Sequence, residues 1–146
     1  MRRGLRQGDP LSSFLFLIVV EGLNVLFSTY VEANQFKGFE VGSNEFIVSL
    51  LQFADDTLIM GEKRWVNIRA IKANLLRFEL QIGLKVNFHE SMLAGVNVNS
   101  SWLQTTTEIL NCKMRCVPFK YLGLPIGDNL RRKVFWKPVI EKIRAS

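Results

Sequence analysis

The chain has 146 residues, of which 48% are hydrophobic, and it contains 11 Phe and 3 Trp. This composition excludes an intrinsically disordered chain and suffices for one domain with a buried core. The formal net charge of +6 favours an anionic partner, and nucleic acid is the first candidate.

The first predicted element is a helix that begins at Asp9-Pro10 and ends near Tyr30. Asp is a good cap, and Pro suits the first helical position. The helix is apolar nearly all round, which predicts burial in the core. The apolar run 14–20 is shorter than the roughly 20 residues that span a bilayer, and no cleavage site follows it. We therefore expect no targeting signal and no membrane contact.

Residues 34–47 are predicted to form a connection or hairpin, and two strands follow around Asp55 and Asp56. These adjacent carboxylates lie between apolar segments, where burial and like-charge repulsion both oppose ionisation. A hard divalent cation would offset both costs, and Mg²⁺ is usually held by one or two carboxylates together with substrate phosphates. The pair therefore suits metal-assisted nucleotidyl transfer. The alternative is a polar hairpin turn that happens to contain two Asp.

A second helix is predicted from about Lys63 to Gln81, and Gly83 ends it. Its apolar residues recur at three- and four-residue steps, which is typical of a helix with one face in the core. These residues are Trp65, Ile68, Ile71, Leu75, Phe78 and Ile82.

The remaining elements are shorter. We expect a strand over 85–88, a helix over 101–110 capped by Ser100, a hairpin over 117–126 and a last helix from about 137. The order of elements predicts an α+β fold in which helices pack on one face of a small antiparallel sheet. Cys112 and Cys116 lack the further ligands of a zinc site and are expected to be intracellular thiols.

Four sequence segments carry a family resemblance, in this order along the chain: Arg3–Ser12, Phe53–Thr57, Gly83–Phe88 and Tyr121–Gly127. Through them the chain closely resembles the reverse transcriptase of plant non-LTR retrotransposons, of the long-interspersed-element type. The resemblance covers essentially all residues, and the first two segments together are quite specific. It implies a partial polymerase palm over residues 1–128, and the start of the thumb or a truncated C-terminal helix over residues 129–146.

The resemblance implies an RNA-directed DNA polymerase that uses Mg²⁺, or Mn²⁺ in its place. The implied partners are an RNA template, a DNA primer and deoxynucleotides, in the nucleus or cytoplasm. Asp55 and Asp56 would be the catalytic metal ligands, with Asp55 the main one. Two metal ions about 4 Å apart would activate the primer hydroxyl and stabilise the leaving pyrophosphate.

The resemblance also implies substrate contacts. Gly8 would let the backbone approach the nucleotide, Gln7 would hydrogen-bond it, and Lys85 follows the second helix in the nucleotide-binding stretch. The primer end would be held by the hairpin residues Tyr121, Leu122 and Gly123. The alternatives are a cap and turn at the first segment and an ordinary packed hairpin at the last.

Some features depart from the family. Glu90 stands where the family usually has Lys, and this charge reversal puts assistance to the leaving group in doubt. The family's third carboxylate lies upstream of the segment at which this chain begins, so we expect the chain alone to be inactive. Two further hypotheses are a non-catalytic nucleic-acid-binding remnant that uses the basic residues of 113–146, and an unrelated α+β packing domain.

Overall fold

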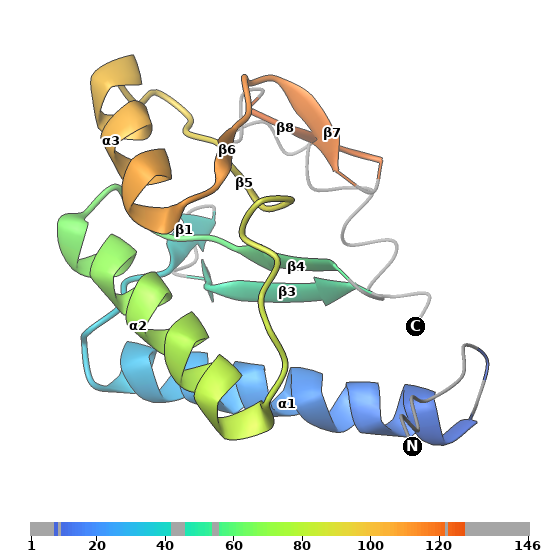
Figure 1. Ribbon diagram of the computed structural model, residues 1–146. Helices are drawn as coiled ribbons and strands as arrows, with labels where there is room; N and C mark the ends of the chain where they lie inside the picture. The colour runs from blue at the N-terminus through green and yellow to red at the C-terminus, as the bar shows by residue number, and fades with distance from the viewer. Residues whose placement is uncertain (1–7, 9, 42–45, 54–55, 122, 128–146) are drawn as a thin grey trace. The chain divides into compact units, whose positions relative to one another are not determined.

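The computed structural model describes residues 8, 10–41, 46–53, 56–121 and 123–127 (Figure 1). They form a mixed α+β fold of helices and small, mostly antiparallel sheets, which confirms the predicted fold class. The chain divides into two compact units: unit 1 comprises Met1–Glu40 and Ile47–Val86, and unit 2 comprises Val41–Phe46 and Asn87–Ser146. The predicted boundary at residue 128 lies outside the described residues and stays a prediction.

Two helices form the larger part of unit 1. Helix α1 (Pro10–Glu32) packs against helix α2 (Trp65–Ile82). Phe27 of α1 is 1% exposed and meets the ring of Phe36 edge to face, with 5.6 Å between the ring centroids. Such aromatic pairs add stabilisation beyond their buried area. Gly83 ends α2 with a φ of 75°, and its N–H donates to the carbonyl of Glu79, as the sequence predicted.

Two strand pairs lie between α1 and α2 in the chain, and the first of them includes Val41 and Phe46, which are grouped with unit 2. Strands β1 (Phe39–Val41) and β2 (Phe46–Val48) pair with one another, in the region predicted to be a connection or hairpin. Strands β3 (Leu50–Phe53) and β4 (Asp56–Ile59) are antiparallel, with Leu50 opposite Ile59 and Phe53 opposite Asp56. Strand β3 also contacts α1. The predicted strand pair around the two Asp residues is therefore confirmed.

The buried Asn67 of α2 ties the helix to the chain that leads into β1. Its Oδ1 accepts a hydrogen bond from the N–H of Lys37 at 2.8 Å, and its Nδ2 donates to the carbonyls of Lys37 and Glu62 at 2.8 and 2.9 Å. At 2% exposure, the side chain replaces water for three backbone groups. The side chains of the same two residues also form an ion pair, with 2.9 Å between Nζ of Lys37 and Oε1 of Glu62.

The described residues of unit 2 form one helix and two strand pairs. Strand β5 (Met92–Leu93) pairs in parallel with strand β6 (Lys113–Met114), and helix α3 (Ser100–Leu110) connects them. Strands β7 (Phe119–Tyr121) and β8 (Leu124–Ile126) form an antiparallel hairpin. The hairpin was predicted, and the parallel pair was not.

Helix α1 is less buried than the sequence predicted. Only Leu23 and Phe27 are buried, and both lie in its C-terminal half. The N-terminal half exposes large apolar side chains: Leu11, Phe14, Leu15, Phe16, Leu17 and Ile18. The expectation of a core helix is therefore wrong for this half, because the described parts of unit 1 cover the helix only around Leu23 and Phe27.

By length and composition α1 could also cross a bilayer, with a mean hydropathy of 1.9 over an 18-residue window. The core helix of a soluble protein passes the same test. Glu21 places a carboxylate in the middle of α1, where a bilayer would make it costly.

Three local predictions are wrong. Residues 85–88 form no strand, because the N–H of Val86 donates to Oε1 of Glu79 and a turn begins at Asn87. Helix α3 is preceded by Asn99 as its N-cap, so Ser100 is the first helical residue and not the cap. Trp65 and Ile82, both expected in the core, are 42% and 39% exposed because they occupy the first and last positions of α2.

Candidate functional site

The β3–β4 hairpin positions the predicted metal ligands. Asp56 is the first residue of β4, is solvent exposed and lies opposite Phe53 in the strand ladder. The next pair along the ladder is Gln52 and Thr57, whose side chains form a hydrogen bond of 2.6 Å from Oγ1 of Thr57 to Oε1 of Gln52. This pairing holds the backbone next to Asp56 in the extended conformation of the strand. Asp55, the predicted main ligand, lies outside the described residues.

Gly8 precedes α1 and has a φ of 87°, a conformation that side-chain-bearing residues rarely adopt. A Cβ added to Gly8 would meet no other atom within 4 Å, so its backbone angle, and not crowding, requires glycine. In Figure 1, β3 runs antiparallel to α1, so the C-terminal end of β3 and the start of α1 lie on the same side of unit 1. Gln7 lies outside the described residues.

Lys85 follows the end of α2 in unit 1, and its side chain is exposed. No ion pair joins it to another described residue. Its predicted role as a nucleotide contact stays a prediction.

The predicted primer contacts belong to unit 2. Tyr121 is half-buried at the end of β7 and lies opposite Leu124 of β8. Gly123, between the two strands, has a φ of 78°, which explains why the turn contains glycine. Leu122 lies outside the described residues. The hairpin thus has the predicted form, and its contact with a primer stays a prediction.

The part of the chain that the structure describes contains no group of three or more His, Cys, Asp or Glu residues that could hold a metal ion. Mg²⁺ does not need such a cage, because one or two carboxylates and substrate phosphates are enough. Asp56 fits this requirement, since its carboxylate is exposed and makes no ion pair with another described residue. The Asp56 carboxylate therefore suits a hard cation that is bound together with a phosphate.

Neither cysteine belongs to a group of metal ligands among the described residues. Cys112 is a half-buried free thiol and Cys116 an exposed one. Burial raises the pKa of the Cys112 thiol, against a smaller lowering by its backbone hydrogen bond. This favours the neutral thiol over the thiolate that would bind a metal.

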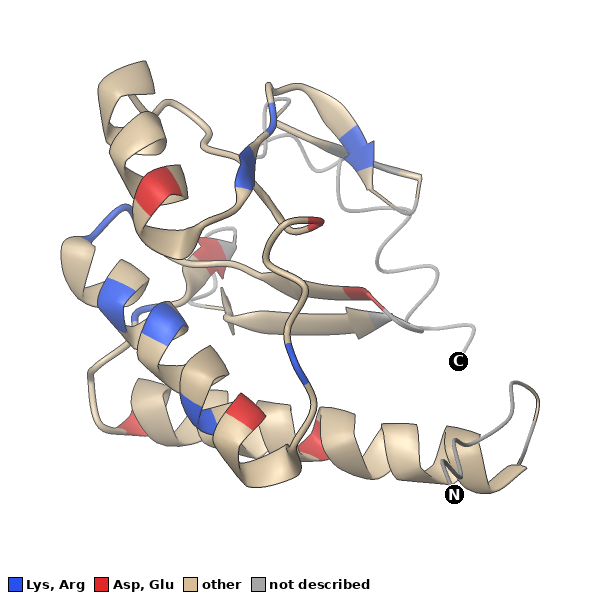
Figure 2. Ribbon diagram, in the orientation of Figure 1, with Lys and Arg blue, Asp and Glu red and all other residues tan. Residues whose placement is uncertain are grey.

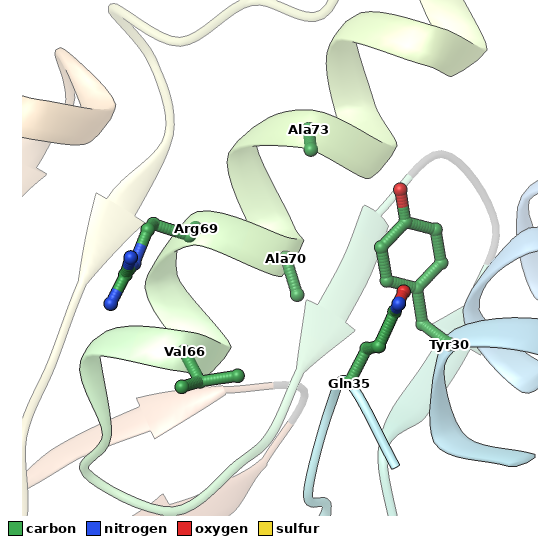
Figure 3. Close-up of a pocket in the computed structure, with 6 residues that line it drawn as sticks. All are labelled: Tyr30, Gln35, Val66, Arg69, Ala70 and Ala73. Carbon is green, nitrogen blue, oxygen red and sulfur yellow. The ribbon is translucent and has the colours of Figure 1, made fainter. Parts of the chain in front are cut away.

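A shallow hollow of about 310 Å³ lies elsewhere in unit 1. Figure 3 shows Tyr30 and Gln35 on one side of it, facing Ala70 and Ala73 of α2, with Arg69 directed away. The lining is mainly apolar and includes none of the predicted site residues. It offers packing surface and no reactive group.

Sequence reasoning missed a cluster of polar and charged contacts in unit 2. Figure 2 shows basic positions on β6, on the segment that follows it and on β7. Lys113 and Arg115 of this group contact residues of the segment that contains β5. The parallel pairing of β5 and β6 brings these segments together. Each strand has only two residues, which is too short for a recognisable sequence pattern.

Comparisons with known proteins relate this chain to proteins of retrotransposable elements. The chain is 29% identical over 135 residues to the retrovirus-related Pol polyprotein of the type-2 retrotransposable element R2DM of Drosophila melanogaster. It is 30% identical over 131 residues to the Pol polyprotein of the type-1 retrotransposable element R2 of Popillia japonica. The chain is thus distantly related to retrotransposable-element Pol polyproteins.

A third relative is an uncharacterized mitochondrial protein of Arabidopsis thaliana, 41% identical over 68 residues. The chain spans 53% of that protein, and 11% and 17% of the two Pol polyproteins. No family model matches the chain. No solved structure matches it either.

Proposed function

We propose that this chain is a segment of the reverse transcriptase of a plant-type non-LTR retrotransposon, and by descent an RNA-directed DNA polymerase. The observation that carries the proposal is the β3–β4 hairpin, which presents Asp56 at the start of a strand within the Phe53–Thr57 motif. The relationship to retrotransposable-element Pol polyproteins, over 92% and 84% of this chain, supports it. That relationship also counts against an unrelated packing domain.

In this proposal Asp55 and Asp56 would hold Mg²⁺, which would neutralise charge on the phosphates of a deoxynucleotide. The bound ion would polarise phosphoryl oxygens and lower the pKa of the attacking hydroxyl. The chain's own part is to fix the ligands: the ladder pairs Phe53 with Asp56 and so orients the strand end. Gln7, Gly8 and Lys85 would position the nucleotide, and Tyr121, Leu122 and Gly123 the primer end.

We further propose that the chain does not polymerise by itself, because two carboxylates are fewer than the concerted set that the family uses. Removing one member of such a set costs orders of magnitude in rate. The chain should therefore retain metal-dependent nucleotide binding without primer extension. Robust extension of a primer on an RNA template that Asp55→Ala abolishes would contradict this part of the proposal.

The test is binding of a fluorescent deoxynucleotide with and without Mg²⁺. We expect binding that requires Mg²⁺ and is lost in the Asp55→Asn, Asp56→Asn double variant, because these carboxylates would hold the ion that the nucleotide phosphates need for binding. Glu32→Gln is the matched control, since Glu32 is an exposed carboxylate at the end of α1. Equal binding by the double variant and the control would contradict the proposal.

A second candidate function is nucleic-acid binding without catalysis. The formal net charge of +6 favours it, because basic side chains that neutralise phosphates drive association by releasing counterions. It differs from the first candidate in requiring no metal at Asp55 and Asp56.

A further inference from the structure

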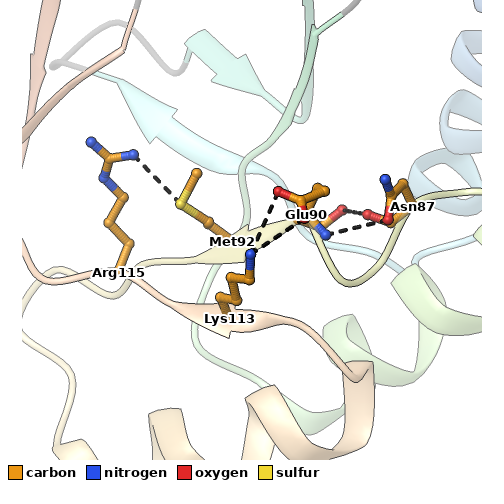
Figure 4. Close-up of polar contacts among 6 residues, drawn as sticks. Asn87, Glu90, Met92, Lys113 and Arg115 are labelled. Carbon is orange, nitrogen blue, oxygen red and sulfur yellow. Dashed lines mark hydrogen bonds and ion pairs between the residues drawn. The ribbon is translucent and has the colours of Figure 1, made fainter.

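Two basic side chains lie next to each other on the β5–β6 pair of unit 2. Lys113 and Arg115 are two residues apart in an extended segment, so their side chains point to the same face. The Nζ of Lys113 is 3.5 Å from Oε1 of Glu90, and Nη1 of Arg115 is 3.5 Å from Sδ of Met92. Figure 4 shows both extending toward the segment that contains β5.

Arg115 is held in place without being neutralised. The guanidinium carbon is 4.7 Å from the ring centroid of Phe119, and Nη1 donates to the thioether sulfur of Met92, a weak acceptor. Arg115 makes no ion pair with any carboxylate in the described ranges. Guanidinium groups bind phosphate through paired N–H donors and stack on bases, so Arg115 presents a charge that an anionic ligand can still use.

Lys113 differs from Arg115 because it forms an ion pair with the carboxylate of Glu90. Both Glu90 oxygens lie 3.5 Å from its Nζ, and the two side chains are 60% and 71% exposed. A long, exposed pair of this kind is weak and is screened by salt. The turn at Asn87 holds the backbone of Glu90, whose N–H donates to the Asn87 carbonyl at 3.2 Å. A phosphate could therefore displace Glu90 from Lys113 at small cost.

We propose that Lys113, Arg115 and Phe119 form a contact site for single-stranded nucleic acid, and that Glu90 weakens this site by competing with phosphate for Lys113. Arg115 and Phe119 supply a stacking surface and a fixed charge, which is how proteins bind single strands without reading sequence. The inference rests on the proposed function, in which nucleic acid is a partner. It adds Lys113 and Arg115, which precede the β7–β8 hairpin, and Phe119 at the start of β7, and it assigns Glu90 the role of weakening the contact.

The test is the fluorescence anisotropy of a short labelled single-stranded RNA, titrated with the full chain at a series of KCl concentrations. Arg115→Gln should weaken binding and lower the slope of log K against log salt by about 0.7, the value for one lost phosphate contact on a single strand. Arg77→Gln is the matched control, because Arg77 is an exposed arginine on α2 in unit 1. It should leave the affinity close to wild type.

Glu90→Gln gives the opposite expectation. Removing the competing carboxylate should tighten binding several-fold and steepen the salt slope, and Lys113→Gln in the same chain should cancel the gain. The substitution is on an exposed side chain, and far-UV circular dichroism checks that each variant is folded. Phe119→Leu, which keeps an apolar side chain in β7, should weaken binding by about fivefold or more through lost stacking.

Equal effects of Arg115→Gln and Arg77→Gln, or no gain from Glu90→Gln, would overturn the inference. Mg²⁺-dependent nucleotide binding through Asp55 and Asp56 would be unaffected by that outcome, so the two proposals fail separately. No RNA binding by the wild-type chain at low salt would also overturn the inference.

Discussion

Two buried asparagines lie seven residues apart on α2, and their surroundings differ. Asn67 satisfies three backbone groups of the segments that flank it. Asn74 is fully buried, and neither atom of its amide has a hydrogen-bond partner among the described residues. A buried amide with good partners stabilises a fold, whereas one without them costs free energy. Asn67 therefore contributes to stability through its amide, and among the described residues Asn74 has no matching contribution.

Asn67→Ala should lower the free energy of unfolding by about 2 to 4 kcal/mol, because it leaves the N–H and carbonyl of Lys37 and the carbonyl of Glu62 without their buried partner. Urea unfolding followed by circular dichroism measures the change. Asn24→Ala is the control, since Asn24 is exposed on α1. A loss no larger than that of the control would contradict the structural role of Asn67.

At the scale of residues, the sequence predicted the apolar stripe of α2 better than its polar members. Ile68, Leu75 and Phe78 are buried, as their spacing indicated. The burial of Asn67 was not predicted, because a polar residue in a helix is expected on the solvent face and one of its two partner residues, Lys37, is 30 residues away in sequence. Among the site residues, Asp56 begins a strand and Gly8 has a positive φ, and their contacts with metal and nucleotide stay predictions.

At the scale of elements, helices with clear end signals were predicted to within about two residues. Pro10 begins α1, and Gly83 follows the last residue of α2. The parallel pair of β5 and β6 was not predicted, because two-residue strands show no periodicity and their pairing depends on the fold between them. The Glu90–Lys113 contact was missed for the same reason.

Replacement by Ala is expected to change stability in opposite directions at two glycines, one just after α2 and one inside α1. Gly83→Ala should destabilise unit 1 by about 1 kcal/mol, because its φ of 75° disfavours a side chain. Gly22→Ala, in the interior of α1 with no atom within 4 Å of an added Cβ, should stabilise by about 0.5 to 1 kcal/mol. Thermal unfolding of both variants measures the difference. A stabilising Gly83→Ala would contradict the left-handed end of α2.

At the scale of the whole molecule, composition and element order were enough to predict an α+β chain, and the structure confirms it. They did not predict that the described strands form four separate two-stranded sheets. They also overestimated the burial of α1, because an apolar sequence shows that a helix can be buried but not which surface covers it. Which strands pair, and which surface covers a helix, depends on residues that are distant in the sequence.

The measurement that tests the central proposal most directly is paramagnetic broadening by Mn²⁺ of the amide signals of the ¹⁵N-labelled chain, with a deoxynucleotide present. Mn²⁺ broadens the signals of nuclei near its binding site, so the broadened signals show which residues lie close to the ion. We predict selective broadening of residues 53–57, abolished in the Asp55→Asn, Asp56→Asn double variant. Broadening centred elsewhere, or unchanged in the double variant, would contradict a metal site at the end of the β3–β4 hairpin.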